Sequence, residues 1–236
     1  MTDSPLPLFE FAQVLPLGLR FPARMSVLPL ERGRLALVSP VPIDDDRAAA
    51  IAALGEVAFL IAPNLLHHLH LGAAAQRYPE ARVLAPSGLR RKRPDLPIGG
   101  SLDQPLPAEL RASVEVVPIG GAPKIDEYAF YHRETRTLVL TDLVFNITRP
   151  EGWLAHLVLW LGGCHGHLGS SRVWRLQLED RVALRASVER LLELPFETLV
   201  MAHGSIVQSA ARAQLQRALA WALPPRGAQP LASSSR

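Results

Sequence analysis

Three of the chain's eight histidines stand within four positions, in the stretch PNLLHHLHLG at 63–72. His67, His68 and His70 could serve a metal site, because imidazole binds zinc, iron and manganese. The same stretch could instead be the first turn of a leucine-rich helix whose imidazoles cap backbone groups or face solvent. Adjacent helical residues diverge by about 100°, so His67 and His68 can share one ion only before regular helix begins. The stretch alone leaves both interpretations open.

Two other apolar strands also end in polar side chains. TLVLT leads to Asp142 and TLVMA leads to His203, as FLIAP leads to the histidine cluster. In layered α/β folds, ligands bind at the C-terminal ends of strands, where loops present side chains around a shared crevice. Asp142 and His203 are therefore candidate partners of the cluster. Their alternatives are a carboxylate that caps the next turn and an imidazole hydrogen-bonded beside Gly204.

The elements that would position these residues alternate between strands and helices. We predict an N-terminal hairpin over 24–40 and a helix over 43–55, followed by strand 57–63, helix 67–79, strand 81–86, a long surface loop 87–112, strand 114–120, hairpin 128–146, helix 178–194, strand 197–204 and helix 208–222. Residues 147–178 are unassigned, as an insert or a lid. We expect one domain over 1–223. The tail 224–236 has a disordered composition, rich in proline, glycine and serine.

Composition limits the function classes. The 236 residues are 48% apolar, enough for a sizeable core, and the net charge is only +3. The basic run GLRRKRPDL ends in Pro and Asp, so we expect a solvated loop and no nucleic-acid partner. Cys164 is the only cysteine, so no internal disulfide can form and the cytoplasm is the simplest location. The N-terminus lacks the basic region of a secretory signal.

The longest apolar candidate for a membrane span is WLAHLVLWLGGC, which starts at Trp153. A bilayer-spanning helix needs about 20 apolar residues, so this segment is too short, and it carries a histidine. We therefore expect no membrane partner. A small-molecule ligand is the expected partner, and the sequence leaves the oligomeric state open.

Four stretches in order resemble the metallo-β-lactamase fold: APNLLHHLHLG, PSGLRRKRPDL, FYHRETRTLVLTDLVFN and AHG. They are more closely similar to an uncharacterised bacterial and plant branch of that superfamily, described only as a domain of unknown function. The resemblance covers residues 21–222. It implies an α/β (α+β) fold, a four-layer αββα sandwich with metal bound at the edge between the two sheets.

The chain departs from the family motif H-x-H-x-D-H. If His67 and His68 stand on the final D-H pair, the H-x-H half falls on Pro63 and Leu65, and another register places it on Asn64 and Leu66. The histidine expected before the central hairpin is missing too, because VPIGGAPKIDE contains none. The three histidines of the family's first metal position are therefore absent.

The resemblance thus implies one remaining divalent metal, zinc first, with iron or manganese as alternatives. Its ligands would be His67 in place of the family aspartate, His68, Asp142 and His203. Ligand atoms around one ion should lie roughly 3 to 4 Å apart, and His70 should point away. Asn64, Asn146 and His132 are expected to orient ligands or contact substrate.

Two functions from different classes remain. A metal-dependent hydrolase would use metal-activated water on an ester, thioester, lactone or phosphodiester, with Asp142 and His67 as the catalytic residues. If only three of the four ligands bind the ion, the fourth becomes a candidate general base. The alternative is a catalytically inactive binding or regulatory module that keeps the crevice.

Overall fold

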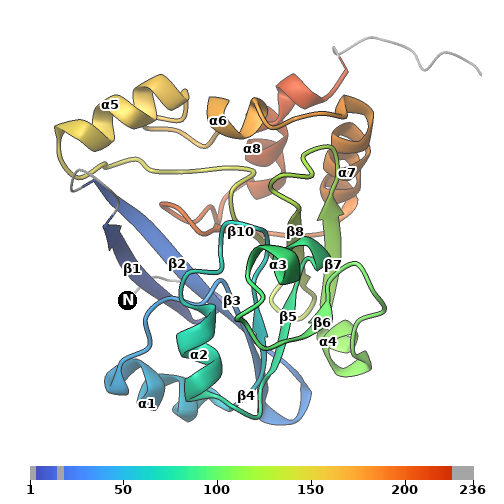
Figure 1. Ribbon diagram of the computed structural model, residues 1–236. Coiled ribbons are helices and arrows are strands. Elements are labelled where there is room, and N and C mark those ends of the chain that lie inside the picture. Colours follow the sequence, from blue (N-terminus) through green and yellow to red (C-terminus); the bar gives the residue numbers. More distant parts are fainter. Residues whose placement is uncertain (1–3, 15–18, 225–236) are drawn as a thin grey trace, which may run out of the picture.

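The computed structural model describes residues 4–14 and 19–224, so residues 225–236 of the predicted tail lie outside the described part. Two sheets form its centre (Figure 1). The larger sheet has the order β1 (Leu8–Val14), β2 (Arg20–Pro29), β3 (Arg34–Val38), β4 (Glu56–Ile61), β5 (Arg82–Ala85) and β6 (Ile98–Ser101). The smaller sheet has the order β10 (Thr198–Met201), β9 (Thr137–Leu140), β8 (Glu127–His132) and β7 (Val114–Ile119).

Helices surround the two sheets. They are α1 (Asp45–Leu54), α2 (Leu71–Arg77), α3 (Ser87–Lys92), α4 (Ala108–Ser113), α5 (Trp153–Gly162), α6 (Arg172–Arg175), α7 (Arg181–Glu193) and α8 (Ala211–Ala218), with short 3-10 turns at Glu31–Gly33 and Ala220–Ala222. In Figure 1, α1 and α2 lie at one end of the view, whereas α5, α6, α7 and α8 lie toward the other.

Three apolar cores separate four layers. On β9, Val139 packs between the two sheets, while its neighbours Leu138 and Leu140 face the other way, into the core under α7 and α8. On β4, Phe59 packs between the sheets and Leu60 faces the core under α1 and α2. This alternation of side chains is the period of two that a strand imposes. The αββα sandwich expected from the sequence is therefore confirmed.

Local sequence signals set the ends of the longer helices. Asp44 caps α1 by accepting the backbone N–H of Arg47 at 2.9 Å, and Asp180 caps α7 by accepting those of Val182 and Ala183. Gly55 closes α1 with φ of +154°, where a Cβ would lie 2.1 Å from the carbonyl oxygen of Gly33. Only glycine fits such an approach.

Two predicted segments differ from the structure. The helix expected over 67–79 begins only at Leu71, and 64–70 forms an irregular turn. The loop expected over 87–112 contains α3, β6 and α4, because Leu89, Ile98 and Leu110 are apolar anchors buried in the cores. The proline, glycine and charged residues between those anchors hid the pattern of short helices and a strand in the sequence. The unassigned segment 147–178 contains α5 and α6.

Strand direction brings the polar strand ends to one edge. β9 and β10 run parallel with Leu140 opposite Met201, so Asp142 and His203 leave the sheet on the same side. β8 runs antiparallel to β9, and its second residue, Tyr128, donates its backbone N–H to the carbonyl of Pro63 at 2.8 Å. The turn after β4 therefore meets the same edge.

Candidate metal centre

Three side chains from three strand ends converge at this edge: His67, Asp142 and His203. The two Nε2 atoms lie 3.2 Å apart, His67 Nε2 lies 3.2 Å from Asp142 Oδ2, and His203 Nε2 lies 3.3 Å from Asp142 Oδ1. Bonds of about 2.0 to 2.2 Å to one ion would separate neighbouring donors by roughly 3 to 4 Å, so the spacing fits a divalent metal. No other group of three metal-ligating side chains in 4–14 and 19–224 lies this close together.

The turn after β4 presents His67 without regular helix. The amide oxygen of Asn64 accepts the backbone N–H groups of Leu66 and His67, both at 2.8 Å, which fixes the turn. On its far side, the ring of His67 meets a hydroxyl, with Nδ1 lying 2.6 Å from Ser39 Oγ. Ser39 follows β3 in a left-handed conformation, with φ of +57°. His67 thus presents Nε2 to the centre while Nδ1 is held by the larger sheet.

His203 is fixed by backbone and by aromatic rings. Its Nδ1 lies 2.6 Å from the carbonyl oxygen of Pro22, and because a carbonyl only accepts, Nδ1 carries the proton and Nε2 offers its lone pair. Phe145 stacks on the imidazole at 5.1 Å and Phe21 meets it edge-on at 4.9 Å. The following Gly204 has φ of +98°, and a Cβ there would lie 2.1 Å from the Asn146 carbonyl oxygen.

Asp142 is held from both ends. Asn64 donates from Nδ2 to its Oδ2 at 2.7 Å and to Thr141 Oγ1 at 3.1 Å. The backbone around it is held by Glu127, whose Oε1 accepts the N–H groups of residues 141, 142 and 143 at 3.0, 2.9 and 3.1 Å and the Thr141 hydroxyl at 2.9 Å. The other oxygen, Oε2, accepts Trp174 Nε1 at 3.2 Å. Glu127 is therefore a second buried carboxylate, and it holds the backbone that carries Asp142.

Sequence reasoning gave Glu127 no role. It opens β8, directly opposite the end of β9 in the antiparallel pair, and is 1% exposed. An acid at the start of an otherwise apolar strand was the available signal. Such an acid is almost never fully buried unless it is paired, and most of its partners are backbone groups that no sequence pattern displays.

Burial and charge shift the pKa values of these groups in opposite directions. Burial alone would raise the pKa of Asp142, but the charge of His67 and the close approach of the His67 and His203 imidazoles hold it well below its usual range. Burial alone would lower the pKa of His67, but the Asp142 carboxylate outweighs burial and raises it. Burial and the nearby Asp142 charge raise the pKa of Glu127. Without an ion, Asp142 and His67 therefore favour each other's charged forms.

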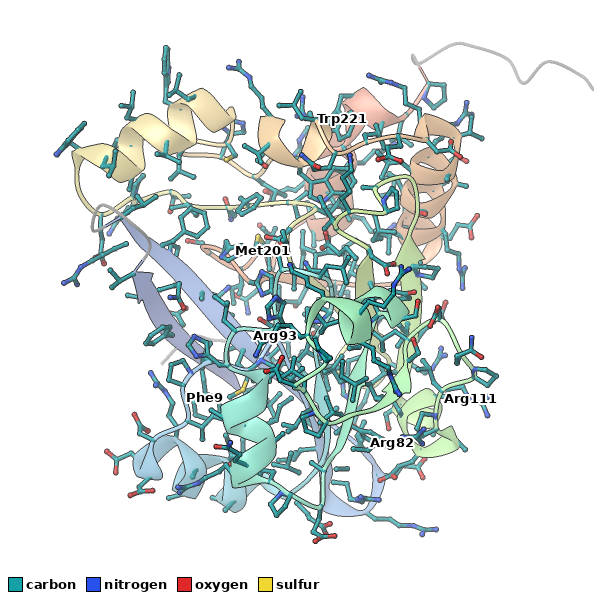
Figure 2. All side chains as sticks on the ribbon, in the orientation of Figure 1. Phe9, Arg82, Arg93, Arg111, Met201 and Trp221 are labelled. Atoms are coloured by element: carbon teal, nitrogen blue, oxygen red, sulfur yellow. The ribbon has the colours of Figure 1, made fainter. Side chains whose placement is uncertain are left out.

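His68 is not one of the converging side chains, contrary to the expectation from sequence. Its Nδ1 lies 3.0 Å from Nη1 of Arg93, whose position in the molecule is marked in Figure 2. Burial, together with the charges of Lys92 and Arg93, lowers the pKa of His68. Consecutive side chains of a tight turn point in different directions, so only one of the pair reaches the centre. His70 points away as expected, with Nε2 at 3.0 Å from Gln13 Oε1.

The other three predicted site residues have different positions. Asn64 is fully buried and orients both Asp142 and the turn of His67, as described above. Asn146 holds the His203 loop, because its backbone N–H donates to the His203 carbonyl at 3.0 Å and its Nδ2 donates to the Ser205 carbonyl at 2.8 Å. His132 lies at the opposite end of the sheet, paired with Thr137 at the start of β9. The expectation that it serves the site is wrong, since strand position separates it from Asp142.

The basic motif RRKR also has a structural role. Lys92 donates to the carbonyl of Leu65 at 2.6 Å, Arg93 reaches His68, and Arg90 donates to the carbonyl of Ile98 at 2.7 Å. The bonds of Lys92 and Arg93 hold the histidine turn against the end of α3, and the bond of Arg90 ties α3 to β6.

A cavity of about 680 Å³ lies behind His203 rather than over the ligand atoms. Phe21 and Pro22 of β2, Ala202 and Gly204 beside His203, and Leu159 of α5 contribute to its lining, but His67, Asp142 and His203 do not. The side chains of His67, Asp142 and His203 are themselves only 11%, 11% and 9% exposed. The cavity therefore shares a wall with the centre without opening onto it.

Solved structures that share this fold include metallo-β-lactamases at low sequence identity. DIM-1 metallo-β-lactamase exposed to ceftazidime shares 14% identity with a TM-score of 0.60, covering 94% of this chain and 99% of that one. The Hirschia baltica metallo-β-lactamase shares 12% with a TM-score of 0.60, covering 94% and 100%. The mono-zinc form of FIM-1 from Pseudomonas aeruginosa shares 13% with a TM-score of 0.58, covering 95% and 99%. The chain has the metallo-β-lactamase fold.

Within that fold the chain belongs to the family described as domain of unknown function DUF4336, whose profile matches residues 6–157. That range contains His67 and Asp142, while His203 lies beyond it. No curated protein sequence matches the chain significantly.

Proposed function

We propose that the protein binds one divalent metal ion through His67, Asp142 and His203 and acts as a metal-dependent hydrolase. The observation that carries the proposal is that two Nε2 atoms and one carboxylate converge with separations of 3.2 to 3.3 Å. The outer nitrogen of each imidazole meets a protein oxygen, an arrangement that orients metal-binding histidines. The mono-zinc form of FIM-1 indicates that this fold can be occupied by a single zinc in that protein.

Each side chain has a defined task at such a centre. A divalent ion held there would supply hydroxide near neutral pH by acidifying a bound water. His203 keeps its proton at Nδ1 on the Pro22 carbonyl, so Nε2 stays available as a donor atom. Asn64 fixes Oδ2 of Asp142, which leaves Oδ1 toward His203. His68 cannot act as a general base at the centre, because it faces Arg93.

The substrate class follows from the fold by analogy: an ester, thioester, lactone or phosphodiester. Zinc is the first choice of ion for two imidazoles and a carboxylate, with iron or manganese as alternatives.

A second candidate is a catalytically inactive binding or regulatory module. The small exposure of His67, Asp142 and His203 favours it, since a substrate needs access to the centre. The absence of an H-x-H pair from residues 63–66 favours it as well.

Metal analysis of protein purified without a histidine tag tests the metal site. We expect one ion per chain, lost in Asp142→Ala and His203→Ala and retained in His70→Ala and His68→Ala. The His68→Ala variant distinguishes two predictions: the sequence counted His68 as a ligand, whereas in the structure His68 faces Arg93. Wild-type protein that purifies metal-free and ignores added zinc, iron and manganese would overturn the proposal.

Activity is tested separately, on model substrates from the four chemical classes. Hydrolysis by the wild type that Asp142→Ala abolishes supports the hydrolase. Stoichiometric metal without hydrolysis of any class supports the binding module instead.

A further inference from the structure

The helix α5, at Trp153–Gly162, carries no charged residue, and His156 is its one strongly polar side chain. Its buried residues, Ala155 and Leu159, face the protein. The opposite side is apolar too, although it faces solvent. A surface helix of a globular domain normally places charged or polar residues there. The composition of α5 therefore needs an explanation beyond packing against its own chain.

The exposed side of α5 continues onto α6, which contacts it. We call this surface the α5–α6 face; its most exposed members are Trp153 (76%), Trp160 (67%), Leu161 (54%), Val173 (66%) and Leu176 (81%), with Leu157 and Val158 between them. Figure 1 shows α5 and α6 side by side at one end of the molecule, and Trp221 lies at the same end in Figure 2. Contiguous exposed apolar surface of this kind marks an interaction site.

The charged side chains around the α5–α6 face are mostly basic. Residues 147–178 contain three arginines, Arg149, Arg172 and Arg175, against one acid, Glu151. None of the three arginines pairs with an acidic side chain in the described part of the chain; Arg175 instead lies over the ring of Trp221 at 4.6 Å. Two copies of this face would bring like charges together, which disfavours self-association. The complementary partner is anionic and apolar.

We propose that the α5–α6 face docks the protein onto the surface of a bilayer containing anionic phospholipids. Tryptophan concentrates at the interface between headgroups and hydrocarbon, and arginine is attracted to anionic headgroups. Ten residues of helix are about 15 Å long, half the hydrocarbon thickness, so α5 lies in the interface plane. No described helix has the length and apolar content to cross a membrane, which agrees with this placement.

This partner differs from the sequence expectation of no membrane. That expectation rested on the shortness of WLAHLVLWLGGC, which excludes a span but not surface binding. Exposure of both tryptophans is a tertiary property that the sequence does not display. The proposal is independent of the metal centre, so neither result decides the other.

Flotation of the full-length protein with vesicles tests the docking. We expect it to rise with vesicles containing about a third phosphatidylglycerol, less with phosphatidylcholine alone, and less at high salt. Trp153→Ser combined with Trp160→Ser should weaken binding about tenfold or more. Arg149→Gln combined with Arg172→Gln should weaken binding to anionic vesicles roughly fivefold per arginine. The matched control is Leu54→Ser, an exposed leucine on α1 at the other end of the molecule, which should bind like the wild type.

Intrinsic fluorescence gives a second readout. Tryptophan emission of the wild type should shift to shorter wavelength when anionic vesicles are added, and the double tryptophan variant should lose the shift. Wild-type protein that stays in the aqueous fraction with both vesicle types overturns the proposal. So does flotation that the tryptophan substitutions leave unchanged. A wild-type dimer that those substitutions convert to monomer, without flotation, would assign the face to self-association instead.

Discussion

At the scale of single residues, the centre depends on partners that fix each donor atom. His203 is oriented by a backbone carbonyl, which mutation of a side chain cannot remove, whereas His67 depends on the hydroxyl of Ser39. Asp142 depends on Asn64 and, through its backbone, on Glu127. Ser39 and Glu127 can therefore be tested without touching a ligand.

Ser39→Ala should lower metal affinity by about 10- to 100-fold, because loss of an outer partner frees the ligand imidazole to rotate. Competition with a chromophoric chelator measures the affinity. Ser170→Ala is the matched control, since Ser170 is also buried but its hydroxyl has no hydrogen-bond partner in the described part of the chain. Equal affinity of Ser39→Ala and wild type would show that Ser39 does not orient His67.

Glu127→Gln should lower the free energy of unfolding by about 2 kcal/mol, because four donors that now meet a carboxylate oxygen would meet at best a neutral amide oxygen. Urea unfolding measures the change. Glu197→Gln, which removes a solvent-exposed acid paired with Arg136, should change little. A Glu127→Gln variant as stable as the wild type would mean that the buried charge costs as much as its hydrogen bonds contribute.

At the scale of elements, the β8–β9 pair carries polar groups at both ends with different consequences. Glu127 and Asp142 stand at the end that faces the centre, while His132 closes the other end. There its Nε2 lies 2.8 Å from the Pro29 carbonyl and its Nδ1 lies 2.8 Å from Thr135 Oγ1. Burial lowers the pKa of His132, although the bond to Pro29 opposes the shift.

That lowered pKa predicts a loss of stability in acid. Above about pH 6.5 the imidazole is neutral in both the folded and unfolded chains, and its full contribution is present. As the pH falls from there toward the lower folded-state pKa, only the unfolded chain takes up the proton, so stability declines. His132→Gln should flatten the dependence of the unfolding free energy on pH between 7 and 5.

Urea unfolding across that pH range measures the dependence. His167→Gln serves as the control, because it removes an exposed histidine where His132→Gln removes a buried one. A profile of His132→Gln as steep as that of the wild type would contradict the assignment.

At the scale of the whole molecule, the centre lies at the edge of the sandwich and outside its three apolar cores. Those cores contain the large buried side chains of both sheets and of the helices packed on them, and none includes His67, Asp142 or His203. Folding therefore does not depend on the ion, in contrast to small zinc domains that are unfolded without it. Metal binding should add to an already folded state.

We expect chelator-treated protein to keep its secondary structure by circular dichroism. Zinc at about 100 times its dissociation constant should add about 2.7 kcal/mol, which raises Tm by roughly 5 to 10 °C in a chain of this size. Asp142→Ala should show no such shift. Unfolding on chelation, or a zinc shift that persists in Asp142→Ala, would contradict this picture.

The sequence by itself predicted the succession of strands and helices and three of the side chains that converge at the candidate centre, while the four layers were implied by the resemblance to the metallo-β-lactamase fold. Strand geometry is local, so it can be predicted from neighbouring residues. It explains the alternation along TLVLT and TLVM and the apolar runs that lead to His67, Asp142 and His203. The hairpin over 24–40 is confirmed by the same reasoning, as β2 and β3.

Only the tertiary structure decided between His67 and His68, because the direction of each side chain in the turn depends on Asn64, Ser39 and Arg93. The same holds for Glu127 and for Pro22, which lies 181 residues from the histidine it orients. Exposure of α5 is likewise set by what the rest of the chain leaves uncovered. Contacts between distant segments depend on how whole layers pack, and no local pattern of residue types encodes that packing.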